Sequence, residues 1–203
     1  MSLNKLKVGI FGGTFNPPHI AHVKAAEAFA SSLGLDKLLI MPDFLPPHKE
    51  YVGHVSAQER LHMCQLAFSH IDRAEISTLE IDRGGKSYTA DTLASLASDD
   101  YELYFLCGTD MFLTMDTWYK PSVIFSLATI CLIRRESDDD IGRRILAKKE
   151  EYEARFCARI IIIDAPTVEL SSTQARAALL GAGAKDVLPC EVYEFITERG
   201  LYK

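Results

Sequence analysis

Apolar runs of strand length alternate with helix-forming stretches along this chain, and this alternation limits the possible folds more than any other feature. Strands that are joined through helices run parallel in one sheet. We therefore predict an α/β fold with a doubly wound, largely parallel sheet in a single domain, residues 1–203. The expected strands are 8–11, 37–41, 74–76, 78–81, 101–107, 128–133 and 160–163. The expected helices are 19–30, 56–68, 89–97, 138–156, 172–180 and 191–198.

The turn between the first strand and the first helix carries residues that suit phosphate binding. Gly12 and Gly13 have no Cβ, so the backbone there can approach a ligand closely. The helix that follows presents unpaired N–H groups and a partial positive charge to an anion. His19 and His22 are three residues apart on that helix, so both can donate hydrogen bonds to phosphate oxygens from one face. Ligands of such sheets bind at the carboxyl ends of the strands, where this turn lies.

A second stretch with anion-binding character lies at residues 169–176. Ser171 or Ser172 can cap a helix whose first turn carries Thr173 and Arg176. Hydroxyls and N–H groups at a helix start are good partners for phosphate, and an arginine adds a charged fork over the same anion. On these residues alone, an ordinary helix cap with a solvent-facing arginine stays open.

Three shorter patches point to the rest of a ligand. Lys49 places a cation in a proline-rich loop after the second strand, and Thr89 can cap a helix whose N–H groups would accept a carboxylate. Asp110 follows a strong strand, where it can bind ribose hydroxyls. Trp118 is the one tryptophan of the sequence, for which core packing is the commoner role. Each patch alone is also consistent with an ordinary structural role, as an exposed lysine, a helix cap or a core residue.

Taken in order, these stretches resemble the signatures of nicotinate-nucleotide adenylyltransferases, which belong to the nucleotidyltransferases with an (H/T)xGH motif. His19-Ile20-Ala21-His22 matches that motif with Ala21 in place of the usual glycine, and Asn16 stands where many members have aspartate. The other matches are 170–176 to ISSTxxR (with leucine for isoleucine), 46–49 to PPHK, 87–93 to SYTxDTL and 108–118 to GxD…W. The resemblance covers residues 8–176, nearly the whole chain.

The resemblance implies transfer of an adenylyl group from ATP to nicotinate mononucleotide, in NAD biosynthesis. His22 would contact the α-phosphate in the transition state and His19 would assist, without a covalent intermediate; Mg²⁺ would bind through the ATP phosphates, with no metal site of the protein's own. The implied ATP-binding residues are Gly12, Gly13, Thr14, Phe15, His19, His22, Gly108, Asp110, Ser172, Thr173 and Arg176. The implied substrate-binding residues are His48, Lys49, Tyr88, Thr89, Asp110, Trp118 and Arg134.

Composition narrows the functional classes. The formal net charge of −6 argues against broad nucleic-acid binding, which needs a basic face. No apolar run approaches the roughly 20 residues of a membrane helix, and no signal-peptide core precedes the first strand. The five cysteines are widely spaced without a CxxC pair, so we expect no structural zinc and three buried thiols. We expect a cytoplasmic protein without nucleic-acid or membrane partners.

Three alternatives stay open at this point. A phosphopantetheine adenylyltransferase would share the chemistry, but that family usually has threonine in place of His19, is shorter and lacks the SYTxDTL patch. An enzyme for nicotinamide mononucleotide is harder to separate, and the helix start at Tyr88 and Thr89 is the discriminating feature. A non-catalytic nucleotide-binding regulator is disfavoured by the intact His19, His22, Lys49 and Arg176.

Overall fold

The structure, a computed structural model, describes residues 5–46, 55–134, 138–164, 168, 170–181 and 183–203. The described residues form a six-stranded sheet in the order β3-β2-β1-β4-β5-β6, and each pairing between neighbours is parallel. The strands are β1 (Leu6–Gly13), β2 (Lys37–Pro42), β3 (Ala74–Ile76), β4 (Tyr101–Gly108), β5 (Ala128–Ile133) and β6 (Ile160–Ile163). The predicted α/β fold with a parallel sheet is therefore confirmed.

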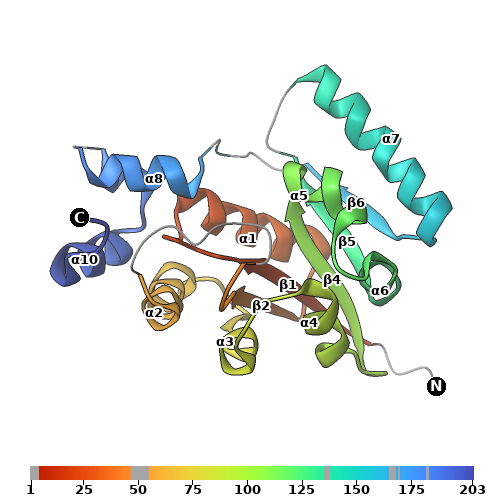
Figure 1. Cartoon of the computed structure of the whole chain (residues 1–203), viewed down its shortest axis with the longest axis horizontal. Helices are drawn as coiled ribbons and strands as arrows, with labels where there is room; N and C mark the ends of the chain where they lie inside the picture. The colour runs from red at the N-terminus through yellow and green to blue at the C-terminus, as the bar shows by residue number, and fades with distance from the viewer. Residues whose placement is uncertain (1–4, 47–54, 135–137, 165–167, 169, 182) are drawn as a thin grey trace.

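Helices cover both faces of this sheet (Figure 1). The helices before β4 are α1 (Ile20–Leu33), α2 (Ala57–Phe68), α3 (Leu79–Arg83) and α4 (Thr89–Leu96). Between β4 and β6 lie α5 (Thr109–Thr114), the 3-10 turn η1 (Met115–Thr117), α6 (Pro121–Leu127) and α7 (Asp139–Phe156). The closing helices are α8 (Ser172–Leu179), α9 (Ala184–Val187) and α10 (Cys190–Arg199).

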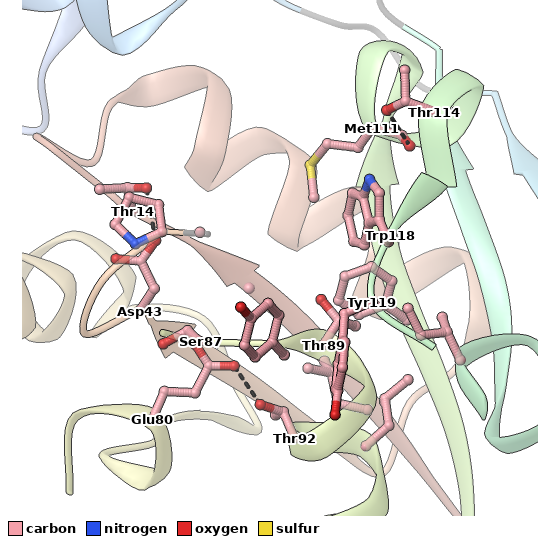
Figure 2. Close-up of a pocket in the computed structure, with 18 of the residues that line it drawn as sticks. Thr14, Asp43, Glu80, Ser87, Thr89, Thr92, Met111, Thr114, Trp118 and Tyr119 are labelled. Carbon is pink, nitrogen blue, oxygen red and sulfur yellow. Dashed lines mark hydrogen bonds between the residues drawn. The ribbon is translucent and has the colours of Figure 1, made fainter. Parts of the chain in front are cut away.

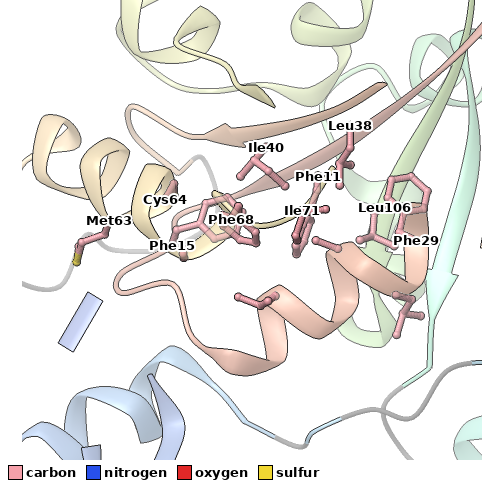
Figure 3. Packing of buried hydrophobic residues seen from close by; sticks show 14 of the residues in the cluster. Phe11, Phe15, Phe29, Leu38, Ile40, Met63, Cys64, Phe68, Ile71 and Leu106 are labelled. Carbon is pink, nitrogen blue, oxygen red and sulfur yellow. The ribbon is translucent and has the colours of Figure 1, made fainter. Parts of the chain in front are cut away.

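Two clusters of buried residues lie on opposite faces of the sheet, because successive strand residues point to opposite sides. One cluster joins Phe11 to residues of α1, α2, α8 and α10, and Figure 3 shows Phe11, Phe15 and Phe68 packed together within it. The other joins Val8 and Ile10 to residues of α4, α5, α6 and α7. The thiols of Cys64, Cys107 and Cys131 are buried in these clusters, as expected.

Close packing of the first cluster depends on one glycine. A Cβ on Gly9 would lie 2.4 Å from Leu35 Cδ1 and 2.8 Å from Phe29 Cε1. Real Cβ atoms do not approach that closely, so any side chain at this position would force Leu35 and Phe29 to shift. Gly9 therefore allows these two side chains to pack directly against β1.

We predicted a strand over 78–81, and this prediction was wrong. The segment forms the start of helix α3, with Thr78 as its N-cap. Thr78 Oγ1 donates to Asp82 Oδ2 at 2.6 Å, and the Asp82 N–H donates to the Thr78 carbonyl at 2.8 Å, so the backbone closes a helical turn. Gly84, at φ 67°, ends this turn. The sequence prediction also missed α5, η1, α6 and α9, which are short and carry weak periodicity.

Candidate active site

The sheet changes direction of winding between β1 and β4, since the chain moves outward to β2 and β3 on one side and to β5 and β6 on the other. A cavity of about 400 Å³ opens at the carboxyl ends of these strands, which is where ligands of doubly wound sheets bind. Figure 2 shows it, with Thr14 and Asp43 at one side and Trp118 at the other. Seven of the predicted site residues line it: Gly12, Gly13, Thr14, Tyr88, Thr89, Asp110 and Trp118.

One wall of the cavity is an aromatic slot, defined by Tyr88, Trp118 and Tyr119. The rings of Tyr88 and Tyr119 lie 4.6 Å apart between centroids, and Trp118 meets Phe105 edge to face at 6.4 Å. Phe105 belongs to β4, so the sheet itself supports the Trp118 ring. Flat apolar surfaces of this kind suit a planar ring. Sequence reasoning did not single out Tyr119.

The start of α4 faces the same cavity. The N-cap is Tyr88, which makes no side-chain capping hydrogen bond, and Thr89 is the first helical residue. Our prediction that Thr89 caps this helix was therefore wrong by one position. Because Tyr88 and Thr89 both line the cavity, the N–H groups of the first turn and the positive end of the helix dipole stand beside the aromatic slot.

The cavity also has a buried carboxyl group, which sequence reasoning missed. Glu80 is 7% exposed and accepts a 2.5 Å hydrogen bond from Thr92 Oγ1, which in turn accepts one from Arg83 at 2.9 Å. Burial raises the pKa of Glu80, and the hydrogen bonds from Thr92 and Ser87 only partly oppose this effect. Ser87 Oγ also accepts from the Phe44 N–H at 3.0 Å, which joins the turn before α4 to the loop after β2.

A fully buried arginine braces the opposite side of the cavity. Arg60 donates to the carbonyl of Thr14 at 2.7 Å, to Asp43 Oδ1 at 3.1 Å, and to the carbonyls of Asp43 and Phe44 at 2.7 and 3.1 Å. Asp43 in turn accepts from Thr14 Oγ1 at 2.7 Å. The loops after β1 and β2 are thus tied to each other through one guanidinium group. A sequence signal existed, since Arg60 falls on the buried stripe of α2 with Met63, Cys64 and Ala67.

The two predicted histidines form a stacked pair at the start of α1. His19 is the N-cap, His22 stands in the first turn, and their ring centroids lie 3.7 Å apart. The His19 N–H donates to Nδ1 of His22 at 3.3 Å. Because Nδ1 accepts that bond, the neutral ring carries its proton on Nε2, which is then a donor. His22 also meets the edge of the Phe15 ring at 5.0 Å between centroids.

Phe15 links this pair to the cavity, although neither histidine lines it. A Cβ on Gly13 would lie 3.1 Å from the Phe15 ring, so glycine allows the ring to pack directly against the turn after β1. Phe15 itself has φ 47°, a left-handed conformation that few residues other than glycine adopt.

The second predicted anion-binding stretch packs against the first. Arg176 donates to the Asn16 carbonyl at 2.7 Å and to Thr173 Oγ1 at 3.1 Å, and Ser172 Oγ donates to the Pro17 carbonyl at 3.3 Å. Ser171 is the cap of α8, through a capping box with Gln174. The structure therefore brings together two motifs that lie about 155 residues apart in the sequence.

The remaining predicted residues lie elsewhere. Arg134 does not line the cavity; it donates to the Asp138 carbonyl at 2.6 Å and packs beside Gly142 at the start of α7. Gly108 ends β4 and is the N-cap of α5. His48 and Lys49 lie outside the described residues.

Within the described ranges, no group of three His, Cys, Asp or Glu side chains is arranged to hold a metal ion. No helix in that part of the chain is long and apolar enough to cross a membrane.

Comparison with known proteins places the chain in a family. The cytidylyltransferase-like family model matches residues 10–178. The chain is 38% identical to a probable nicotinate-nucleotide adenylyltransferase of Listeria monocytogenes serotype 4a, over 98% of both chains. It is 37% identical to the protein of that name in Lactococcus lactis, over 98% of this chain and 97% of the relative. The chain belongs to the cytidylyltransferase-like family and, within it, to the nicotinate-nucleotide adenylyltransferases.

A solved structure shares the fold. The nicotinic acid mononucleotide adenylyltransferase of Plasmodium falciparum, solved in complex with NaAD, superimposes with a TM-score of 0.75 over 97% of each chain, at 16% sequence identity. This chain therefore shares its overall fold with that structure.

Proposed function

We propose that this chain transfers the adenylyl group of ATP to nicotinate mononucleotide, giving nicotinate adenine dinucleotide and pyrophosphate. One observation carries the proposal: an aromatic slot, a helix start and a glycine turn share a single cavity at the point where the sheet reverses its winding. The names of its relatives agree with this assignment.

The slot and the start of α4 account for the pyridine end of the substrate. A pyridine ring would lie between Trp118 and the tyrosine pair, with its carboxylate toward the N–H groups of Tyr88 and Thr89. A helix N-terminus favours a negative group by about 0.3–2 kcal/mol. Nicotinate mononucleotide would then be preferred over the uncharged amide by up to about thirtyfold from this source.

Asp110 and the glycine turn account for the sugar and phosphate. Asp110 stands at the start of α5 on the cavity wall, where its carboxylate would accept hydrogen bonds from ribose hydroxyls. The phosphate would then reach the backbone of Gly12 and Gly13, which line the same cavity. Thr14 is held by Asp43 and shapes the end of this turn.

The triphosphate of ATP would lie between the histidine pair and the start of α8. His22 Nε2 would donate to the α-phosphate, and Ser172, Thr173 and Arg176 would contact the β- and γ-phosphates. The substrate phosphate oxygen attacks the α-phosphorus, its new P–O bond forms as the bond to pyrophosphate breaks, and no proton must be removed first. Catalysis then rests on positioning and on stabilising charge, as in other phosphoryl-type transfers.

Mg²⁺ completes the proposal as a partner of the nucleotide. The ion would keep several waters and bind mainly through the phosphates of the nucleotide. When bound there, it offsets the negative charge of the triphosphate. Arg176 and the histidine pair supply the protein's share of that compensation, together with His48 and Lys49 if those residues act as predicted.

The test is pyrophosphate release with both substrates and Mg²⁺, compared between the wild type and His22→Ala. Removal of one preorganised donor costs about 10²–10³ in turnover. His62→Ala is the matched control, because His62 is an exposed histidine of α2 whose ring lies near Gln65 and Phe195. Native turnover in His22→Ala would contradict the proposed site, and a fall in both variants would point to a folding defect.

A further inference from the structure

The segment 14–19, which joins β1 to the histidine pair, is held from outside by residues far away in the sequence. At its centre, Asn16 is 5% exposed and is not part of any helix or strand. Its neighbour Phe15 packs against the ring of His22, and His19, three residues after Asn16, donates its N–H to that same His22 ring. Asn16 therefore lies between two residues that contact the His22 ring.

One of the bonds to Asn16 comes from Tyr202, which lies 186 residues further along the chain. The Tyr202 hydroxyl donates to Asn16 Oδ1 at 2.5 Å. Tyr202 also packs against the buried cluster that contains Phe11 and Phe15. Neither the sequence patterns nor the family motifs single out this tyrosine.

The end of α10 aims Tyr202 at its partner. Gly200 ends the helix in the left-handed conformation at φ 63°, and the Leu201 N–H returns to the Ile196 carbonyl at 3.0 Å. This pairing is a common helix-ending motif that reverses the chain direction. Figure 1 shows α8 and α10 on the same side of the molecule, so that both can reach the segment before α1.

Among the contacts of Asn16 in the described residues, the bonds from Tyr202 and Arg176 differ in character. Its carbonyl accepts from Arg176, a residue that the proposed function also assigns to ATP phosphates. When Arg176 binds phosphate, its N–H donors must be shared between the phosphate and the Asn16 carbonyl. Tyr202, in contrast, has no part in the proposed nucleotide contacts. The bond from Tyr202 can therefore hold Asn16 while Arg176 engages the nucleotide.

We propose that Tyr202 is a positioning residue for the transfer step: its hydroxyl bond to Asn16 holds segment 14–19, and with it His19 and His22, in the reactive arrangement. This inference rests on the proposed function for its kinetic part. One hydrogen bond has a net value that corresponds to about two- to tenfold in a rate or equilibrium constant. Tyr202→Phe is therefore expected to lower kcat by about two- to tenfold.

The KM for nicotinate mononucleotide should not change in this variant. The aromatic slot is built by α4 and the region of Trp118, which pack on the face of the sheet opposite α10. A purely structural role for Tyr202 would instead lower stability and leave the kinetics of the folded fraction unchanged. The separation between kcat and KM, at a temperature where all variants are folded, thus distinguishes the two roles.

The experiment compares the wild type, Tyr202→Phe, Asn16→Ala and the double variant. If Tyr202 acts through Asn16, Tyr202→Phe lowers kcat in the wild type and adds nothing in the Asn16→Ala background. Tyr193→Phe is the matched control, because it removes the same atom from α10 without touching Asn16 in the described contacts, and it should keep wild-type kcat. Equal losses in both backgrounds, or an unchanged kcat in Tyr202→Phe, would overturn the proposal.

Amide hydrogen exchange gives a readout that does not depend on turnover. Peptides covering residues 14–22 should exchange faster in Tyr202→Phe than in the wild type and in Tyr193→Phe. Unchanged exchange in these peptides would overturn the positioning role. A wild type that releases no pyrophosphate would contradict the proposed function instead, and the exchange result would still decide whether Tyr202 holds this segment.

Discussion

Replacement of Arg60 by methionine should lower the free energy of unfolding much more than the small change in side-chain volume suggests. The guanidinium is fully buried and donates to four oxygens of the loops after β1 and β2. Methionine can fill the space but donates nothing, so Asp43 keeps its buried carboxylate and loses its Arg60 ion partner. Removing one member of a buried ion pair typically costs about 3–5 kcal/mol.

Urea unfolding measures this cost directly. With a denaturant slope of about 3 kcal/mol/M, a loss of 3–5 kcal/mol lowers the midpoint by roughly 1–1.7 M. Arg73→Met is the control, because Arg73 is exposed and donates to the Leu35 carbonyl at 2.7 Å; it should cost less than about 1 kcal/mol. A stability of Arg60→Met within about 1 kcal/mol of the wild type would refute the reasoning, since the bonds of Arg60 would then contribute little to the free energy of unfolding.

Two further predictions concern packing and pH. Gly9→Ala should destabilise by about 1–3 kcal/mol, because its Cβ would overlap Leu35 and Phe29, whereas Gly183→Ala, with nothing within 4 Å, should be nearly neutral in thermal or urea unfolding. Burial raises the pKa of Glu80, so the folded state binds its proton more tightly than the unfolded chain does, and this contribution to stability falls as pH rises from the ordinary carboxyl range through the raised value. Glu80→Gln should flatten that part of the stability–pH curve, and a steeper curve in the variant would contradict the assignment.

The sheet could be predicted from sequence because its four inner strands, β2, β1, β4 and β5, are largely buried on both faces. All six residues of β5 are buried, and such continuous apolar runs stand out between amphipathic helices. The prediction for segment 78–81 was wrong because polar and apolar residues alternate there as in a strand. In the structure the adjacent residues Glu80 and Ile81 are both buried, and the hydrogen bond from Thr78 to Asp82 cannot be read from the alternation. Helix α6 carried a readable signal in Pro121 at its first turn, which the prediction did not use.

The parts of the site that sequence motifs mark are those that would touch ligands. The residues that brace them were not predicted, because their partners are chosen by the tertiary fold. Arg60 reaches Thr14 across 46 residues, and Tyr202 reaches Asn16 across 186. For Arg134, the place after a strand suggested a ligand contact; its guanidinium donates to the Asp138 carbonyl at the start of α7, and a ligand contact stays a prediction.

The most direct test of the central claim compares kcat/KM for pyrophosphate release with nicotinate mononucleotide and with nicotinamide mononucleotide, at equal ATP and Mg²⁺. The aromatic slot beside the positive end of α4 predicts a clear preference for the acid, with the helix start alone contributing up to about thirtyfold. Equal use of the two would leave an adenylyltransferase but contradict the carboxylate site at Tyr88 and Thr89. No release with either mononucleotide would contradict the proposed function itself.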